Sequence, residues 1–419
     1  MRSPPSTARA SNLAREAAAP PFLPYGRQCI EDDDIEAVAG ALRGEFLTTG
    51  PLVGRFEQAL ASLTGAREAL ACSSGTAALY IAARALGLGP GDTVIVPAIT
   101  FLATASAPHL AGAEIVFADV DPESGLMRAS DLDAALGHAP QGRASAVFPV
   151  HYAGQSCDME AIAGLARARG LKIVEDAAHA LGTAWQTADG ALLPIGANAH
   201  SDLTIFSFHP VKTVAMGEGG AVTANDPALI ARAKRARNHG ITREPGEFVL
   251  SDAAFDATGA ANPWYYELET PGFNFRISDV NCALGLSQLA KLHRFVTRRR
   301  ALVQAYDELL APLAPLIVPL KREARSLTAW HLYAVRVDFA AACLSRGELM
   351  RALAADGIGT QVHYIPVHRQ PYYAARYGAQ NLPGADAYYA RTLTLPLHAG
   401  MIDGDVARVV TALKKHLGF

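Results

Sequence analysis

The segment EALACSSGTAALYIAARALGLGPGDTVIVP (residues 68–97) is the part of the chain from which its fold is most readily inferred. Its two ends, Glu68–Cys72 and Thr93–Pro97, are short apolar runs typical of strands that are buried on both faces. Gly75–Leu86 between them is rich in Ala and Leu and predicts a helix. LGLGPGD (residues 86–92) predicts the end of that helix and a turn. The segment therefore predicts strand, helix and strand.

The same alternation continues along the next 130 residues, which is typical of a largely parallel sheet covered by helices. Helical patterns separate most of the strands, for example Phe101–Ala111 and Met159–Ala168. Five further strands are predicted at Glu114–Val120, Ala144–Val150, Lys172–Asp176, Thr204–Phe208 and Gly220–Ala224. We therefore expect an α/β fold with a large, mostly parallel seven-stranded sheet.

The pattern changes after a long predicted helix at Ser278–Asp307, so we expect a large domain at residues 21–295 and a smaller α+β domain at 296–419. In the smaller domain we predict helices near Arg346–Ala355 and Asp405–His416. Its strands are predicted at His331–Val337, Gly359–Ile365 and Thr392–Pro396. The polar, aperiodic stretch between Gly240 and Gly272 contains an aromatic cluster, Trp264-Tyr265-Tyr266, and a loop this long is usually functional or interfacial.

Composition restricts the class of protein. Of 419 residues, 50% are hydrophobic and 18% charged, which suits a large core and excludes disorder. The net charge of −3 excludes nucleic-acid binding by bulk charge. Five cysteines without metal-ligand spacing indicate a reducing compartment. The sequence contains no uninterrupted run of about 18 apolar residues, so we expect no membrane-spanning helix. Residues 1–20 lack the apolar core of a signal peptide, so we expect a disordered extension on a cytoplasmic protein.

The strongest chemical signal is SFHPVK (residues 207–212), which is followed by the Gly-rich turn GEGG at residues 217–220. A lysine at the end of an apolar strand can lie desolvated in a pocket. Desolvation lowers the pKa of the amine and makes it a nucleophile for carbonyl chemistry. The alternative is an ordinary surface lysine after a strand, and the local sequence alone does not separate the two interpretations of Lys212.

Two further motifs lie at predicted strand ends. VEDAAH (residues 174–179) places two acids at the carboxyl end of an apolar strand, where open α/β sheets form their sites. A buried Asp176 can hold a protonated ring nitrogen of pyridoxal 5'-phosphate (PLP), whereas for Glu175 we favour a helix-capping role. CSSGT (residues 72–76) opens a helix and offers amides and hydroxyls to a phosphate, although Ser and Thr are also ordinary N-caps.

A phosphate cradle, an acid for a ring nitrogen and a reactive lysine, in this order, suit PLP. The order resembles the aspartate-aminotransferase-like fold (fold type I) of PLP-dependent enzymes. Nearly the whole chain resembles the DegT/DnrJ/EryC1/StrS family of nucleotide-sugar aminotransferases. The resemblance rests on the stretches SSGTAAL, TFLATA, EDAAHALG, FSFHPVKTVAMGEGGAV, GFNFRISDVNCALGLSQL and QVHYIPVH.

The resemblance implies a role for each matching residue. Lys212 matches the lysine that bonds covalently to the cofactor, and Asp176 the acid on its ring nitrogen. His179 matches a residue near the ring hydroxyl, and Phe101 an aromatic side chain stacked on the ring, although from the sequence alone Phe101 is better explained as a core residue. Asn274 matches an asparagine that reaches the phosphate of the neighbouring subunit, which implies a homodimer with shared active sites. The implied phosphate cradle is Gly75, Thr76 and Ser207.

The same resemblance implies the substrates. Residues 150–162, 264–276 and 361–373 are most similar to the subgroup that acts in pseudaminic acid biosynthesis. That subgroup implies transfer of an amino group from L-glutamate to C4 of UDP-2-acetamido-2,6-dideoxy-β-L-arabino-hex-4-ulose. The implied sugar-nucleotide site consists of Tyr25, Glu45, Phe46, Leu47, Thr48, Ser74, Gln361, Val362, His363 and Tyr364.

Three alternatives to this function remain. One is an aminotransferase for another nucleotide 4-keto-6-deoxysugar, of the bacillosamine or perosamine type. A sugar 3-dehydratase is disfavoured because that subgroup has histidine in place of Lys212, and a non-catalytic regulatory protein has no use for such a lysine. We expect no metal site, because His363 and His368 lie on opposite faces of a predicted strand. His209 has no argued role beyond that of a hydrogen-bonded structural histidine.

Overall fold

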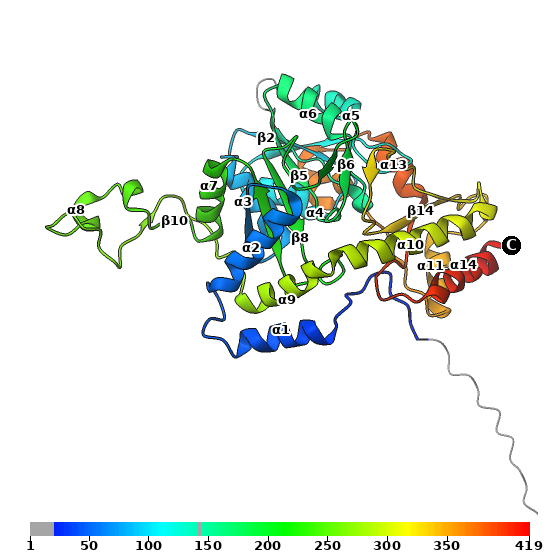
Figure 1. Cartoon of the computed structure of the whole chain (residues 1–419). Helices are drawn as coiled ribbons and strands as arrows, with labels where there is room; N and C mark the ends of the chain where they lie inside the picture. The colour runs from blue at the N-terminus through cyan, green and yellow to red at the C-terminus, as the bar shows by residue number, and fades with distance from the viewer. Residues whose placement is uncertain (1–20, 141–143) are drawn as a thin grey trace, which may run out of the picture.

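A computed structural model describes residues 21–140 and 144–419, so the predicted disordered extension at 1–20 lies outside the described residues. A seven-stranded sheet in the order β1-β9-β8-β5-β4-β2-β3 forms its centre (Figure 1). β9 runs antiparallel to its two neighbours, β1 and β8, and every other pair of neighbouring strands in this sheet is parallel. This arrangement confirms the predicted fold class. The strands are β1 (Glu68–Cys72), β2 (Thr93–Pro97), β3 (Glu114–Ala118), β4 (Ala144–Val147), β5 (Lys172–Asp176), β8 (Leu203–Ser207) and β9 (Gly220–Ala224).

The segment that predicted the fold forms β1, α3 and β2 as expected. Ser74 is the N-cap of α3 (Gly75–Ala85), and its hydroxyl accepts a hydrogen bond from the Ala77 amide at 3.1 Å. Gly87 has a φ of 77°, a left-handed conformation that glycine adopts without strain, so the chain turns away after the helix. α3 thus begins at the carboxyl end of β1, where its N-terminus faces the same edge of the sheet as the end of β5.

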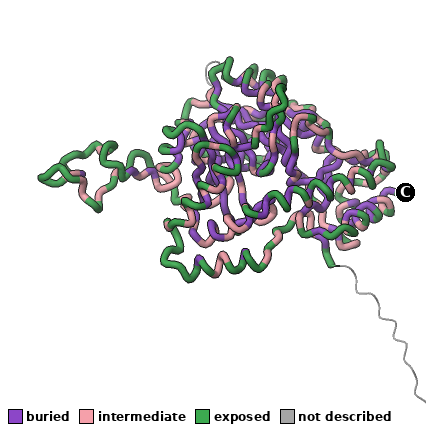
Figure 2. The backbone as a smooth tube through the Cα atoms, viewed as in Figure 1, coloured by how far each residue is buried: buried purple, intermediate pink, exposed green. Residues whose placement is uncertain are grey.

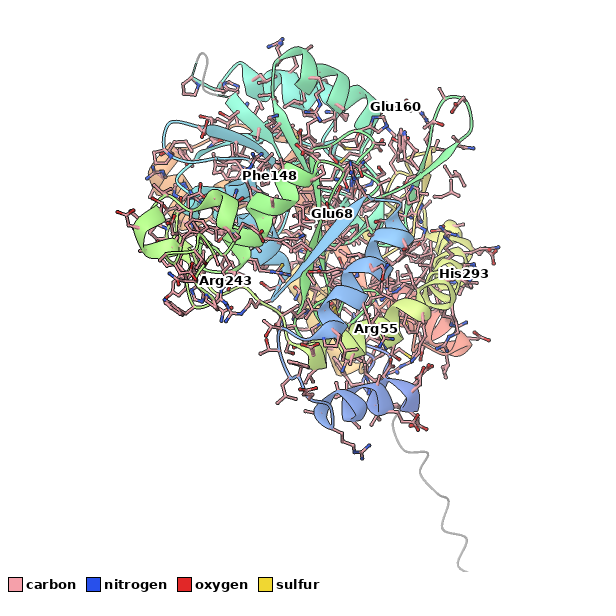
Figure 3. All side chains as sticks on the ribbon, turned by 60° about the vertical axis from the view of Figure 1, so that its left-hand side comes forward. Arg55, Glu68, Phe148, Glu160, Arg243 and His293 are labelled. Atoms are coloured by element: carbon pink, nitrogen blue, oxygen red, sulfur yellow. The ribbon has the colours of Figure 1, made fainter. Side chains whose placement is uncertain are left out.

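Helices cover both faces of the sheet, which explains why its strands are continuously apolar. α3, α4 and α7 pack on one face, and α2, α5, α6 and α9 contribute to clusters on the other. Figure 3 shows side chains filling the interior, with Phe148 near its middle, whereas Arg55 and His293 are exposed. The bounds are α2 (Pro51–Thr64), α4 (Leu102–Leu110), α5 (Ala129–Leu136), α6 (Met159–Ala168), α7 (Pro227–Arg237) and α9 (Asp279–Ala290).

The predicted long helix is two helices, because it is interrupted at Lys291. α9 ends before this residue and α10 (Leu292–Leu310) follows it. The ammonium group of Lys291 lies 2.9 Å from Asp34 on α1 (Asp32–Leu42) and 3.4 Å from Glu31. α1 therefore lies along α9, as Figure 1 shows.

The C-terminal part has its own apolar core, which the N-terminal Leu23 joins. A three-stranded antiparallel sheet, β12-β14-β15, lies at its centre. The predicted strand at 359–365 is wrong: this segment has one isolated bridge, Gln361 to Thr394, and otherwise lacks ladder pairing. The division into domains at residue 295 stays a prediction. The elements are β12 (Ile317–Pro319), β14 (Tyr333–Val337), β15 (Thr392–Leu395), α11 (Arg346–Ala355), α12 (Pro371–Tyr377), α13 (Pro383–Arg391) and α14 (Asp403–Leu417).

Two small sheets were not predicted. One joins β6 (Ala184–Gln186), β7 (Leu192–Pro194) and β13 (Ser326–Leu327). The other, β10 (Ile241–Thr242) with β11 (Glu267–Leu268), forms the base of an arm at residues 241–272 that also carries α8 (Ser251–Ala254). This arm projects from the body in Figure 1 and is mostly exposed in Figure 2. No helix among the described residues is long and apolar enough to cross a membrane.

Candidate active site

A cavity of about 740 Å³ opens at the edge of the sheet where β1, β5 and β8 end. Its size is that of sites for small molecules and cofactors. One wall comes from these strand ends and another from residues 361–364, far along the chain. Thirteen of the residues predicted for the site line it: Tyr25, Ser74, Gly75, Thr76, Phe101, Asp176, His179, Ser207, Lys212, Gln361, Val362, His363 and Tyr364.

Lys212 follows β8 and is half-buried at the cavity. A turn holds its backbone, since its amide donates to the His209 carbonyl at 2.8 Å. Burial lowers the pKa of its ammonium group to about 8, although Asp176 acts in the opposite direction. A large fraction of this amine is therefore neutral near pH 8, which is the form that acts as a nucleophile or base.

Asp176 ends β5 and is buried in the wall of the cavity. Its carboxylate accepts hydrogen bonds from the Thr104 hydroxyl at 2.7 Å and the Ala178 amide at 3.1 Å. Burial raises the pKa of this carboxyl, while these two hydrogen bonds and Lys212 lower it. Asp176 is thus a fixed acceptor that favours a cation beside it. Thr104 was missed from the sequence, although it lies three residues after Phe101 in the TFLATA stretch.

The start of α3 forms a cradle suited to a phosphate. The Ser74 hydroxyl already accepts from Ala77, which leaves the amides of Gly75 and Thr76 as open donors, because the first amides of a helix have no acceptor within it. A Cβ atom on Gly75 would lie only 2.8 Å from the Cβ of Ser207, and one on Gly220 only 2.2 Å from the Ser74 carbonyl oxygen. These glycines therefore let three chain segments approach one another at the cradle.

Aromatic rings surround the space between the cradle and Lys212. Phe101 is 56% exposed and lines the cavity, so the core position that the sequence alone favoured is wrong. His179 is buried, and its Nε2 lies 3.1 Å from the Tyr364 hydroxyl. His331, which was missed, lies against His179 with ring centroids 4.5 Å apart. Burial lowers the pKa of these imidazoles and that of His363, the last to about 3, so all are neutral at pH 7.

Two predicted groups do not reach the cavity of this chain. Residues 45–48 are exposed and pair instead with the start of α9, where the Asp279 amide donates to the Leu47 carbonyl at 2.9 Å. Asn274 is also exposed, and its side chain accepts from the Arg276 amide at 3.1 Å. Neither group lines the cavity.

Two interpretations of polar residues need correction. Glu175 does not cap a helix: it points away from the cavity, where its carboxylate accepts from the ring of buried His151 at 2.7 Å. His209 is exposed at the cavity, with one long contact of 3.5 Å from the Val211 amide, so it is not a well-bonded structural histidine.

The predicted strand that separated His363 from His368 is absent. His363 Nδ1 instead lies 2.9 Å from the Thr394 hydroxyl. Among residues 21–140 and 144–419, no three His, Cys, Asp or Glu side chains are placed to hold a metal ion.

A model of the DegT/DnrJ/EryC1/StrS aminotransferase family matches residues 28–414. The chain belongs to this family. It is 39% identical over 397 residues to the spore coat polysaccharide biosynthesis protein SpsC of Bacillus subtilis (strain 168), a match that covers 94% of this chain and 96% of SpsC. The predicted family is thereby confirmed.

Solved structures agree with this membership. The structure of Helicobacter pylori PseC, an aminotransferase involved in the biosynthesis of pseudoaminic acid, is similar with a TM-score of 0.84 and 27% identity, covering 95% of this chain and 99% of PseC. Spr1654 of Streptococcus pneumoniae in its PLP form has a TM-score of 0.81 and 28% identity, covering 95% and 99%, and it was also solved in a PMP form. The protein is a PLP-dependent sugar aminotransferase of fold type I.

The residues at the cavity fit this cofactor. The open amides of Gly75 and Thr76 suit its phosphate, and the fixed carboxylate of Asp176 suits a protonated ring nitrogen. The exposed face of Phe101 suits an aromatic ring, and the amine of Lys212 suits its aldehyde.

Proposed function

We propose that this protein transfers an amino group from L-glutamate to C4 of a UDP-linked 4-keto-sugar, with Lys212 as its catalytic acid and base. The observation that carries the proposal is the half-buried Lys212, whose pKa is lowered to about 8, in one cavity with buried Asp176 and the open amides of α3. A regulatory protein on the same fold would gain nothing from this arrangement, which costs stability because an amine and a carboxylate are desolvated together.

When bound, the cofactor supplies an electron sink for the carbon that loses its proton. Lys212 Nζ takes a proton from the α-carbon of the donor and, in the second half of the reaction, returns one to C4 of the sugar. The Asp176 carboxylate would accept a hydrogen bond from the protonated ring nitrogen and keep it charged. Thr104 and Ala178 hold that carboxylate in place. His179 would lie near the ring hydroxyl of the bound cofactor, and Ser207 would complete the phosphate cradle with Gly75 and Thr76.

The acceptor that we propose is UDP-2-acetamido-2,6-dideoxy-β-L-arabino-hex-4-ulose, which would place the reaction in pseudaminic acid biosynthesis. The similarity to PseC over nearly the whole chain supports it. The cavity extends past the cofactor residues to Tyr25, Ser74 and residues 361–364, which leaves room for a sugar nucleotide. Tyr25 offers a ring face for a uracil or sugar, and the side chains of Gln361, His363 and Tyr364 offer polar groups.

We also propose a homodimer with shared active sites. Asn274 and residues 45–48 are exposed and away from the cavity of their own chain, so they are free to reach the cavity of a second copy. In this arrangement Asn274 contacts the partner's cofactor phosphate, and residues 45–48 contact the partner's sugar nucleotide.

A second acceptor is supported by a different observation. The identity of 39% to SpsC exceeds the 27% to PseC, and SpsC takes part in spore coat polysaccharide biosynthesis. The alternative is therefore another nucleotide 4-keto-6-deoxysugar, of the bacillosamine or perosamine type.

The two candidate acceptors can be distinguished by assaying the purified enzyme with L-glutamate against a panel of UDP-, TDP- and GDP-linked 4-keto-sugars. The two C5 epimers differ in where one methyl group points, and such a difference is worth about 1–3 kcal/mol in an apolar pocket. We expect the β-L-arabino ketose to be preferred over its D-xylo epimer by about ten- to a few-hundred-fold in kcat/KM. Faster turnover of the D-xylo epimer, or of a TDP- or GDP-sugar, would contradict the first acceptor and support the alternative.

A further inference from the structure

Residues 361–364 form a wall of the cavity without belonging to a regular strand. Their position must therefore be fixed mainly by contacts other than a β-ladder. Backbone pairing holds one end, where the Gln361 amide donates to the Thr394 carbonyl at 3.1 Å and the Thr394 amide donates to the Gln361 carbonyl at 2.8 Å. The ring of His363 is tied to the Thr394 hydroxyl at 2.9 Å.

Two buried tyrosines hold the other end, at the carbonyl of His363. Tyr152, which lies in the turn after β4, donates its hydroxyl to this carbonyl at 2.8 Å. Tyr388 on α13 donates to the Tyr152 hydroxyl at 2.7 Å and approaches the same carbonyl at 3.3 Å. The Thr392 hydroxyl donates in turn to Tyr388 at 3.0 Å. The result is a chain of hydroxyls, all pointing toward His363, in which each bond polarises the next.

The ring of Tyr152 also borders the cavity residues directly. Its centroid lies 6.3 Å from that of Tyr364 and 6.2 Å from that of His179, and its edge packs on Tyr388 at 5.7 Å. Both tyrosines are fully buried, and Gly125 packs so closely that a Cβ there would lie 3.1 Å from Tyr152 and 3.2 Å from Tyr388. Both rings are therefore closely packed, which restricts the positions that their hydroxyls can take.

The turn that carries Tyr152 is itself anchored to β5. The His151 amide donates to the Asp176 carbonyl at 3.0 Å, and the Ala153 carbonyl accepts from the His331 amide at 2.9 Å. The same short turn thus contacts the strand that presents Asp176 and the two C-terminal segments, at His331 and at His363, that face the cavity.

We propose that Tyr152 and Tyr388 are positioning residues for the sugar-nucleotide substrate: their hydroxyl chain fixes residues 361–364 against the part of the cavity that holds Lys212 and Asp176. The inference rests on the proposed function, because it takes residues 361–364 to contact the acceptor. Neither tyrosine lines the cavity, so both act through His363 and Tyr364.

The test compares the variants Tyr152→Phe and Tyr388→Phe with Tyr306→Phe as a matched control. Tyr306 is equally buried, and its hydroxyl also donates to a backbone carbonyl, that of Pro396 at 2.9 Å, which does not line the cavity. Tyr306→Phe removes one buried hydroxyl hydrogen bond, whereas Tyr152→Phe and Tyr388→Phe each remove at least two, so all three should lower the Tm and the latter two by more. If Tyr152 and Tyr388 have a purely structural role, a lower Tm is the only change expected in their variants.

We expect Tyr152→Phe and Tyr388→Phe to raise KM for the keto-sugar nucleotide by about 5- to 20-fold, with kcat and KM for glutamate within about 3-fold. Affinity for the amino-sugar product, measured by calorimetry, should fall by the same factor. Tyr306→Phe should change neither. The proposal is overturned if the two variants match Tyr306→Phe in these constants, or if KM for glutamate rises as much as KM for the sugar.

Hydrogen exchange separates failure of this inference from failure of the proposed substrate. If the panel assay identifies a different acceptor, KM is measured for that one. Without any acceptor, faster exchange of the amides in residues 361–365 is still expected in Tyr152→Phe and Tyr388→Phe, and not in Tyr306→Phe. Unchanged exchange there would show that the hydroxyl chain does not position this segment.

Discussion

At the scale of single residues, burial lowers the pKa of the Lys212 ammonium group to about 8, so more of this amine is neutral at a given pH than in an ordinary lysine. Lys212 lies beside neutral imidazoles and one buried carboxylate, so its charge is poorly compensated. Burial of this amine is therefore unfavourable for stability, which supports the catalytic role that we propose for Lys212.

Replacing the lysine should remove activity without harming the fold. We expect Lys212→Ala to lower kcat by at least about 10⁴-fold, because one side chain supplies both the covalent bond to the cofactor and the proton transfer. Its described hydrogen bond is made by the backbone amide, which alanine keeps, so the Tm of the cofactor-free protein should stay within about 3 °C. Steady-state turnover by this variant without added amine would show that another group is the catalytic base.

The lowered pKa can be observed directly in the cofactor-free protein. An ordinary lysine has a pKa of about 10.4, whereas burial lowers the pKa of Lys212 to about 8. Only the neutral amine reacts with an acylating reagent, so acylation of Lys212 should rise to half its maximum rate near pH 8. Peptide mass spectrometry measures the rate at Lys212 and at the exposed Lys234 in the same sample. A midpoint near pH 10 at Lys212 would contradict the burial argument.

At the scale of elements, β5 shows how one strand serves two purposes. Successive side chains of a strand point to opposite faces, so Asp176 faces the cavity while Glu175 faces the other way. Glu175 bonds to His151, whose own Nδ1 accepts from the Cys157 amide at 3.1 Å. The end of β5 thus presents Asp176, the proposed partner of the cofactor's ring nitrogen, and anchors the turn that bears Tyr152.

The anchoring carboxylate gives a pH-dependent stability whose sign follows from its pKa. Burial alone would raise the pKa of Glu175, but hydrogen bonds from His151 and Ser201 hold it below its ordinary value of 4.5. Its contribution is therefore fully present above pH 4.5 and is lost as the pH falls through the lower native value. We expect Glu175→Gln to cost about 1.5–3 kcal/mol at pH 7, and progressively less as the pH falls below 4.5 and through the lower native pKa of the wild-type carboxyl.

Urea unfolding of both proteins from pH 3 to pH 7 measures this difference. Glu160→Gln is a matched control, because Glu160 forms a partly exposed ion pair with Arg325 at 2.8 Å and should cost at most about 1 kcal/mol. A Glu175→Gln penalty that does not change with pH would indicate loss of packing alone.

The same strand illustrates what the sequence predicts and what it does not. Apolar runs that end in polar or small residues predicted all seven strands of the central sheet. The polar residues at the ends of β1, β5 and β8 also indicated the edge of the sheet at which the cavity opens. Partners far apart along the chain leave no local pattern. Thr104 bonds to Asp176 across 72 residues, and His331 reaches the cavity through a turn at Ala153. The segment 359–365 was predicted as a strand because its composition suits one, yet side-chain hydroxyls fix much of it.

At the scale of the whole molecule, one chain leaves apolar side chains uncovered. Trp264 and Val249 on the arm are 72% and 82% exposed, and Ile35 and Leu42 on α1 are each 59% exposed. Large apolar side chains exposed together mark surfaces for association. Asn274 follows the arm directly, so a surface that covers the arm would bring Asn274 near a second chain.

The proposed dimer predicts that two inactive variants restore activity when mixed. Suppose that Asn274 serves the partner's cavity. A mixed dimer of Lys212→Ala and Asn274→Ala then has one site with both lesions and one site with neither. Random exchange at equal amounts makes half of the dimers mixed, each with one intact site of two, so about a quarter of the wild-type activity should return.

The control is each variant incubated alone through the same exchange procedure, with exchange itself verified by native mass spectrometry of differently tagged chains. If Asn274 acts in its own chain, each chain carries its own lesion whatever its partner, and mixing restores nothing. Loss of activity in Asn274→Ala together with no recovery in verified mixed dimers would therefore contradict the shared site. Recovery near a quarter would require that Asn274 of one chain and Lys212 of the other serve the same active site.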